Sequence, residues 1–146
     1  MLITGINGML SQNLVKEFAR DWEISGVDLT ESVYPTKQGI SVTKLDLTQT
    51  QTLREHIESL RPQAIIHTAA YTNVDGAEDN REIAFAVNGQ VPGDLAIISK
   101  SLDIPLIHIS TDYVFSGDHG PYQENQPLSP RGAYAESKTA GESAVL

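Results

Sequence analysis

The stretch MLITGINGML, residues 1–10, decides the fold class that the sequence predicts. Residues 2–4 form an apolar run typical of a buried strand, and the G-x-x-G turn of Gly5 and Gly8 follows directly. Apolar residues then recur at helical spacing through residue 20, at Leu10, Leu14, Val15 and Phe18. The chain is therefore expected to open with a strand, a glycine turn and a helix.

The glycine turn predicts a nucleotide site. A turn without Cβ atoms lets a pyrophosphate approach the backbone, and the start of the following helix supplies aligned N–H groups and a favourable dipole. Ser11 stands where a third glycine would let the helix and the strand pack closely. A plain strand-to-helix turn is therefore the alternative, but the position at the start of a βαβ unit favours nucleotide binding.

Strands and helices alternate along the rest of the chain. Apolar runs predict further strands at residues 24–27, 40–45, 64–67 and 104–109. Because these runs are apolar throughout, they indicate a parallel sheet that is covered on both faces. We expect an α/β fold with a doubly wound, Rossmann-type sheet of strand order 3-2-1-4-5, with its ligand cleft at the carboxyl ends of the strands.

The helices between these strands have recognisable ends and apolar faces. Thr48 and Gln51 resemble a capping box for a short helix that Pro62 stops. Its expected buried stripe is Leu53, Ile57 and Leu60. A long helix is expected from about residue 80, with a kink or a break at Pro92-Gly93. Its inward side chains are expected to be Ile83, Val87, Val91, Leu95 and Ile98. A long loop at residues 110–132 then leads to a last helix from about residue 133.

Composition argues against several classes of function. The net charge of −9 leaves no basic surface for nucleic acid or for an anionic membrane, so neither is an expected partner. The chain has no cysteine, and its four histidines are scattered, so no metal site is expected. The N-terminus lacks the features of a signal peptide, and no segment approaches the ~20 apolar residues of a membrane span, which predicts a cytoplasmic protein.

Acidic residues follow two of the predicted strands. Asp28 stands about twenty residues after the glycine turn, where a carboxylate would accept hydrogen bonds from an adenosine ribose. The first cation after it is Lys37, so a 2′-phosphate would meet a negative charge, and NADH is favoured over NADPH. Asp46 could meet the adenine amino group. Either aspartate could instead be an ordinary turn residue.

The stretch GAYAESK, residues 132–138, places Tyr134 and Lys138 four residues apart. In a helix this spacing stacks them on one face, roughly 5–6 Å apart at Cβ. A fixed ammonium beside a phenol favours the phenolate, so the pair could act as a tuned general acid. Ser110 and Thr111 end the last predicted strand, and their hydroxyls are expected to face the same cleft. Taken alone, a pair at this spacing is far more often part of a solvated helix face, and only the rest of the chain favours a catalytic role.

Several longer motifs resemble the extended short-chain dehydrogenase/reductases, most closely the dTDP-4-dehydrorhamnose reductases. The motifs are TGINGML at residues 4–10, Asp46-Leu47, HTAAYTNVDGAED at 67–79, Val87-Asn88, HISTDYVFSGDHGPYQE at 108–124 and PLSPRGAYAESKTAGESAVL at 127–146. The resemblance implies reduction of the C4 keto group of a dTDP-4-keto-6-deoxy sugar, in dTDP-L-rhamnose biosynthesis, with NADH or NADPH as the cofactor.

The resemblance also implies residue roles. Tyr134 would protonate the developing alkoxide, Thr111 would hydrogen-bond the same oxygen, and Lys138 would hold the nicotinamide ribose. Asp112 and Tyr113 would border the sugar. The implied cofactor-binding residues are Gly5, Asn7, Gly8, Met9, Leu10, Asp28, Asp46, Leu47, Ala69, Ala70, Tyr71, Asn88, Tyr134 and Lys138.

The family's chains are longer, which sets the expected extent of this one. We expect residues 1–146 to form an NAD(P)-binding Rossmann-type domain that is truncated before the later strands and the substrate domain. The expected partners are a dTDP-sugar substrate and a second copy in a homodimer. One alternative is a non-catalytic NAD(P)-binding subunit resembling the regulatory β subunit of methionine adenosyltransferase, and another is a different sugar-nucleotide reductase or epimerase.

Overall fold

The sheet lies at the centre of the computed structural model, which describes residues 1–31 and 40–146. Its strands are β1 (Leu2–Thr4), β2 (Ser25–Asp28), β3 (Ser41–Lys44), β4 (Ile65–His67) and β5 (Leu106–His108). All the pairings are parallel, in the order β3-β2-β1-β4-β5. Leu2 lies between Ser25 and Ile65 in the register. The predicted doubly wound sheet and its strand order are confirmed.

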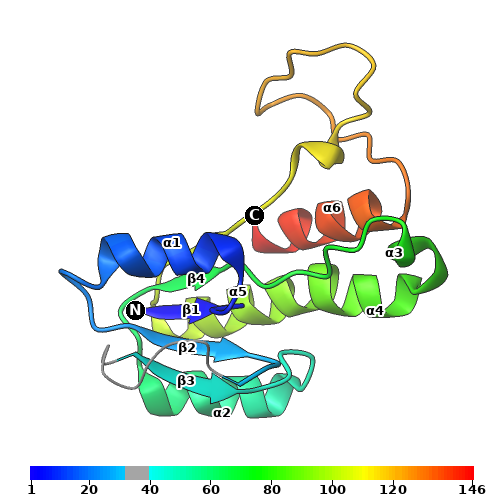
Figure 1. Cartoon of the computed structure of the whole chain (residues 1–146). Helices are drawn as coiled ribbons and strands as arrows, with labels where there is room; N and C mark the ends of the chain where they lie inside the picture. Colours follow the sequence, from blue (N-terminus) through cyan, green and yellow to red (C-terminus); the bar gives the residue numbers. More distant parts are fainter. Residues whose placement is uncertain (32–39) are drawn as a thin grey trace.

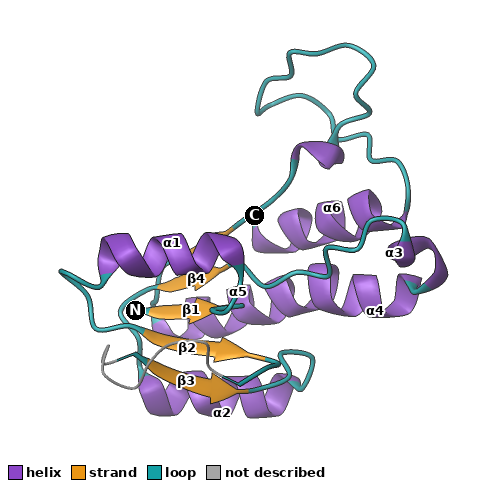
Figure 2. Ribbon diagram, in the orientation of Figure 1, coloured by secondary structure: helices purple, strands orange, loops and turns teal. Residues whose placement is uncertain are grey.

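Helices cover both faces of the sheet (Figures 1 and 2). Helix α1 (Met9–Phe18) packs on one face, and α2 (Thr50–Leu60) and α5 (Val91–Leu102) pack on the other. Successive strand residues point to opposite faces, so Leu2 and Ile3 are both completely buried but in different cores. The α1 core contains Ile3, Ile6, Val15, Ile24 and Ile66, and the larger core contains Leu2, Val27, Leu53, Ile57, Ile65, Leu95 and Ile98.

The predicted break at Pro92-Gly93 is wrong. Two short helices, α3 (Gly76–Asp79) and α4 (Arg81–Phe85), lead through a π-helical turn, η2 (Ala86–Gln90), directly into α5. Pro92 falls in the first turn of α5, where a missing N–H is tolerated. The irregularity therefore precedes the proline. It lies where a Cβ at Gly141 would overlap the carbonyl oxygen of Asn88, so helix α6 (Ala133–Val145) approaches the chain closely there.

The π turn also explains an error in the predicted apolar stripe. Val91, Leu95 and Ile98 are buried as expected, but Ile83 is 54% exposed. One extra residue in the turn rotates everything before it by about 100° relative to a regular helix. Ala84 therefore faces inward in place of Ile83, and it packs with Ala77 and Ala133.

Two expectations for α2 are also wrong. The Thr48 hydroxyl donates to the Asp46 carboxylate at 2.8 Å, and α2 begins at Thr50 without a side-chain cap among the described residues, so there is no capping box. Leu53 and Ile57 are fully buried, but Leu60 is 36% exposed because it lies in the last turn, just before the left-handed Arg61. Across the described part of the chain, no helix combines the length and apolarity needed to cross a bilayer.

Candidate active site

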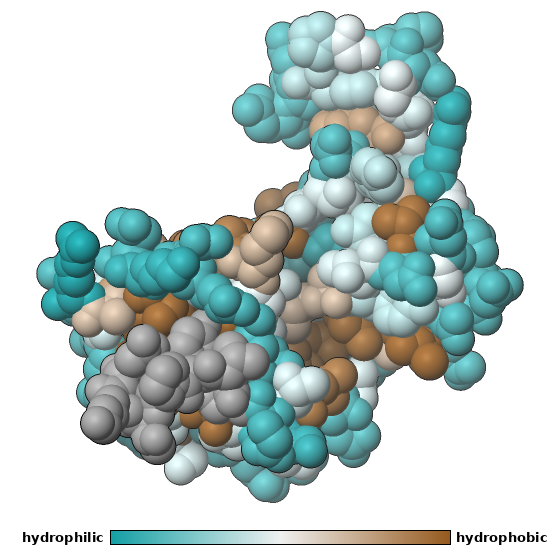
Figure 3. Space-filling view, viewed as in Figure 1, coloured by the Kyte–Doolittle hydropathy of each residue, from teal (hydrophilic) through white to brown (hydrophobic). Residues whose placement is uncertain are grey.

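A cleft of about 620 Å³ lies at the carboxyl ends of β1 to β4. Figure 3 shows the hollow, with apolar side chains gathered near the centre of that face. Its lining includes ten of the residues expected to bind a cofactor, namely Gly5, Asn7, Gly8, Met9, Leu10, Asp28, Asp46, Leu47, Ala69 and Ala70. The cleft is therefore where the doubly wound topology places a ligand.

The glycine turn lets the backbone after β1 pack closely against neighbouring backbone. Gly5 has φ +67°, a conformation that favours glycine, and a Cβ there would lie 2.7 Å from the Ala69 Cα. A Cβ at Gly8 would lie 3.1 Å from the Gly5 carbonyl oxygen. Gly8 is the N-cap of α1, and no described side chain caps that helix. The first-turn N–H groups of α1 can therefore serve an anion, which fits a pyrophosphate.

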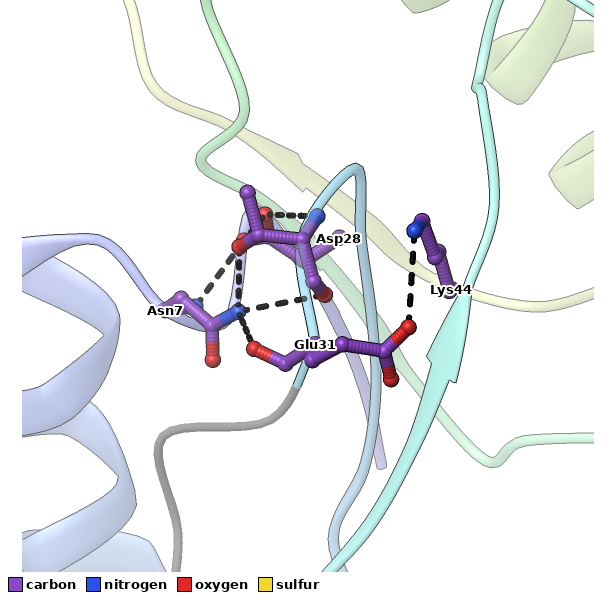
Figure 4. A network of polar contacts seen from close by, with 5 residues as sticks. Asn7, Asp28, Glu31 and Lys44 are labelled. Atoms are coloured by element: carbon purple, nitrogen blue, oxygen red, sulfur yellow. Dashed lines mark hydrogen bonds and ion pairs between the residues drawn. The ribbon is translucent and has the colours of Figure 1, made fainter.

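A polar network holds Asp28 at the wall of the cleft (Figure 4). Its carboxylate accepts hydrogen bonds from the Asn7 backbone N–H at 3.0 Å and from the backbone N–H and hydroxyl of Thr30 at 3.1 and 3.0 Å. The Asn7 amide donates to Thr30 and to the Glu31 carbonyl oxygen, and Glu31 forms an ion pair with Lys44 at 3.4 Å. Lys37, the first cation after Asp28 in the sequence, lies outside the described residues.

Asp46 shapes the turn between β3 and α2. One of its carboxylate oxygens accepts hydrogen bonds from the backbone N–H and the hydroxyl of Thr48, at 3.0 and 2.8 Å. This is the turn role that the sequence left open for it. Asp46 also lines the cleft, so its role in the turn does not prevent it from contacting a ligand.

Ser11, which occupies the position of a third glycine, is completely buried. Its hydroxyl shares a 2.6 Å hydrogen bond with the hydroxyl of Thr68, which in turn donates to the Thr4 carbonyl oxygen at 2.7 Å. The serine therefore ties α1 to the strands instead of keeping them apart. Thr68 also lines the cleft, although a single threonine after a strand carries no distinctive sequence pattern that would predict this.

Helix α6, which carries Tyr134 and Lys138, lies at the same edge of the sheet as the cleft. Lys138 is buried in α6, and its ammonium donates to the Ile109 carbonyl oxygen, just after β5, at 2.6 Å. Burial lowers the pKa of Lys138, and the nearby Glu142 carboxylate acts in the opposite direction. The ring of Tyr134 meets the edge of Tyr113 with ring centroids 5.9 Å apart.

The two hydroxyls expected at the end of β5 have different surroundings. The Ser110 hydroxyl donates to the Glu142 carboxylate on α6 at 2.5 Å. The Thr111 hydroxyl accepts from the Tyr113 N–H and donates to Asp112, both at 3.3 Å, at the start of the 3₁₀ helix η3 (Asp112–Val114). Because η3 packs against α6, Thr111, Asp112 and Tyr113 lie near the helix that carries Tyr134.

Asn88 links these two parts of the site. Its side chain is buried in the π turn, where it accepts from the Tyr71 N–H at 2.8 Å and donates to the Tyr71 carbonyl oxygen at 3.0 Å. It also donates to the Ser137 hydroxyl, next to Lys138, at 3.0 Å. Asn88, Tyr71, Tyr134 and Lys138 are not among the residues that line the cleft. In this structure Asn88 fixes the loop after β4 against α6.

Two histidines lie near Lys138, one at the end of β4 and one at the end of β5. The rings of His67 and His108 stack with centroids 5.2 Å apart, and His67 Nδ1 shares a 2.6 Å hydrogen bond with the Thr4 hydroxyl. Burial, followed by the nearby His108 and Lys138, lowers the pKa of His67 to about 3. Burial and Lys138 lower the pKa of His108 to about 4. Both rings are therefore neutral at neutral pH.

The carboxyl edge of the sheet thus holds a glycine turn with an uncapped helix start and, on α6, the phenol of Tyr134 and the ammonium of Lys138. Within residues 1–31 and 40–146, no group of three or more His, Cys, Asp or Glu side chains could hold a metal ion. The chemistry that the site supports is proton transfer beside a bound nucleotide.

Comparison with known protein families matches residues 1–146 to the RmlD substrate-binding domain. The chain belongs to the RmlD substrate-binding domain family. Among curated relatives, the chain is similar to a probable low-salt glycan biosynthesis reductase, Agl14, of Haloferax volcanii. The two are 40% identical over 144 residues, which cover 98% of this chain and 47% of that protein. The chain spans about half the length of the curated relatives it matches.

Solved structures of RmlD-like reductases have the same fold. A hypothetical dTDP-4-dehydrorhamnose reductase from Sulfolobus tokodaii superposes with a TM-score of 0.92 at 36% identity, covering 99% of this chain and 51% of that one. A dTDP-4-dehydrorhamnose reductase from Bacillus anthracis, crystallised in complex with NADP, gives a TM-score of 0.85 at 35% identity, covering 99% of this chain and 48% of that one.

Proposed function

We propose that this chain is the NAD(P)H-binding part of a reductase that acts on the C4 keto group of a dTDP-4-keto-6-deoxy sugar, of the dTDP-4-dehydrorhamnose reductase type. The observation that carries the proposal is that the glycine-lined cleft and the Tyr134–Lys138 helix, anchored on Ile109 just after β5, lie at the same edge of the sheet. The names of the relatives support the substrate class, and the complex of the Bacillus anthracis protein supports the cofactor.

The residues of the cleft fit a nicotinamide dinucleotide. The turn at Gly5 and Gly8 would hold the pyrophosphate, and Asp28 would accept from the adenosine ribose. The carboxylate of Asp28 already accepts three hydrogen bonds, from the Asn7 N–H and from the N–H and hydroxyl of Thr30. Because an ionised carboxylate offers about four acceptor positions, one remains for a ribose hydroxyl. Ala69 and Ala70 would let the cofactor lie against the backbone.

The side chains of this protein would carry out the proton transfer. NAD(P)H, when bound, supplies the hydride that reduces the carbonyl carbon. Tyr134 would donate its phenolic proton to the alkoxide oxygen that develops at C4, and Thr111 would donate a hydrogen bond to the same oxygen. Lys138, anchored on Ile109, would hold the nicotinamide ribose and stabilise the phenolate that Tyr134 becomes. Asp112 and Tyr113 would border the sugar.

We also propose NADH as the preferred cofactor. Asp28 places a carboxylate at the cleft wall, and Lys44 on the neighbouring strand is already paired with Glu31. A 2′-phosphate would therefore meet a negative charge. Comparing the affinities for NADH and NADPH tests this part separately, and a higher affinity for NADPH would reject it.

Turnover of dTDP-4-keto-L-rhamnose tests the proposed function. A version of the chain extended to the length of its relatives is mixed with the sugar nucleotide and NADH, and loss of NADH absorbance and formation of the reduced sugar are followed. Tyr134→Phe should abolish turnover and leave the affinity for NADH near that of the unaltered chain. Tyr122→Phe is the matched control and should retain activity. It changes a tyrosine stacked on Phe115 in the projecting loop, residues 115–132 between η3 and α6 (Figure 1). Equal activity in Tyr134→Phe would exclude Tyr134 as the acid.

A further inference from the structure

Helix α6 carries Tyr134 in its first turn, and that turn lacks a cap of its own. The N-cap residue is Gly132, which has φ +84° and makes no side-chain cap hydrogen bond. The first N–H groups of a helix have no partner inside the helix, so they need one from elsewhere. The position of Tyr134 therefore depends on what meets this end of α6.

The missing partner comes from a different part of the chain. The carboxylate of Glu78, in the one-turn helix α3, accepts a hydrogen bond from the Ala133 N–H at 2.7 Å. A negative charge at the start of a helix also complements the helix dipole. Glu78 belongs to the GAED segment, residues 76–79, which contributes nothing to the lining of the cleft.

Gly132 and Glu78 are matched in shape. A Cβ at residue 132 would lie 2.7 Å from the same Glu78 oxygen that accepts from Ala133, and the positive φ of Gly132 disfavours other residues. A glycine at this position therefore serves the approach of the carboxylate as well as the turn of the backbone.

Arg81 adds a second link between the same elements. Its guanidinium lies 3.7 Å from the other Glu78 oxygen and 2.5 Å from the Glu136 carboxylate in the first turn of α6. Beneath these links, Ala77, Ala84 and Ala133 form a buried cluster, and the ring of Tyr134 packs against it. Residues on both sides of Tyr134 are thus held by α3 and α4.

We propose that Glu78 is a positioning residue for Tyr134: its carboxylate caps α6 across the chain and so sets where the phenol lies. The inference rests on the proposed function for its catalytic consequence, but the cap itself can be tested without turnover. Neither Glu78 nor Arg81 lines the cleft, so cofactor binding is expected to be independent of both.

Amide exchange and NMR test the cap. Glu78→Ala should speed hydrogen exchange at the Ala133 N–H by about twofold to thirtyfold, the range set by the loss of a helix cap. It should also shift the ring signals of Tyr134, because that ring packs against the edge of Tyr113. Glu78→Gln keeps an acceptor oxygen and should largely restore both signals. Glu82→Ala removes an exposed carboxylate from the neighbouring helix and is the control that should change neither.

Kinetics test the consequence. Because a misplacement of about 1 Å can cost about 100-fold in rate, Glu78→Ala should lower kcat by about tenfold to 100-fold while the Kd for NADH stays unchanged. Glu78→Gln should stay within about fivefold of the unaltered chain, since the exposed ion pair with Arg81 contributes little. Unchanged exchange and Tyr134 signals in Glu78→Ala, or unchanged kcat, would overturn the inference. Absence of turnover in the unaltered version extended to the length of its relatives would reject the proposed function, and exchange and the ring signals would still decide the role of Glu78.

Discussion

Lowering the pH from about 8 to about 5 should destabilise the folded chain, with His67 as the main cause. His67 is buried at the end of β4 with a pKa of about 3, against an ordinary value of 6.5. At pH values between these two pKa values, the unfolded chain binds a proton at this ring and the folded chain does not. Stability is therefore complete above the ordinary pKa and is lost as the pH falls toward the folded pKa.

The magnitude follows from the distance to the ordinary pKa. At about pH 5 the ordinary pKa of 6.5 lies about 1.5 units above the pH, so the unfolded ring is protonated while the folded ring is still neutral. This difference lowers the free energy of unfolding by about 2 kcal/mol. His108, with a pKa of about 4, acts in the same direction, but its ring is only half-buried, so solvent reduces its share.

Urea unfolding at both pH values measures the effect. His67→Asn removes the titrating ring and can keep a hydrogen bond to the Thr4 hydroxyl, so the stability difference between the two pH values should shrink by about 2 kcal/mol. His119→Gln, in the exposed loop, is the control and should keep the full difference. The same pH dependence in His67→Asn and the unaltered chain would refute the assignment to His67.

Three further changes test the core and the cleft. Leu53→Ala should lower the free energy of unfolding by about 2–5 kcal/mol in urea titration, because the side chain is fully buried under the sheet. Gly5→Ala should cost at least about 1–2 kcal/mol for the left-handed backbone and should also weaken NADH binding in a fluorescence titration, because the new Cβ would lie 2.7 Å from Ala69. Ser11→Ala should cost about 1 kcal/mol in thermal unfolding, because only its bond to Thr68 is lost.

The sheet could be predicted from the sequence because parallel strands buried on both faces are continuously apolar. Each of the expected strands is present, and the ends of β2 to β5 differ from the predicted ends by at most two residues. The order of the strands followed from the alternation with helices and from the glycine turn at residues 5–8. Local apolar patterns therefore carried most of the fold.

The sequence could not place features that depend on contacts between distant elements. The π turn at residues 86–90 arises where α6 packs closely on Asn88, and nothing in residues 80–102 alone indicates it. The cap on α6 joins Glu78 to Ala133 across 55 residues, so no local spacing predicts it. The Ser11–Thr68 hydrogen bond joins residues that are also far apart in the sequence.

Titration of the purified chain with NADH, followed by nucleotide fluorescence, tests the central claim most directly. The account predicts saturable binding by the unaltered chain and a weaker affinity in Gly8→Val, whose side chain would crowd the Gly5 carbonyl oxygen at the mouth of the anion site. Gln126→Ala in the projecting loop is the matched control and should bind normally, because it lies outside the cleft. Absence of saturable binding of either NADH or NADPH to the unaltered chain would contradict the account.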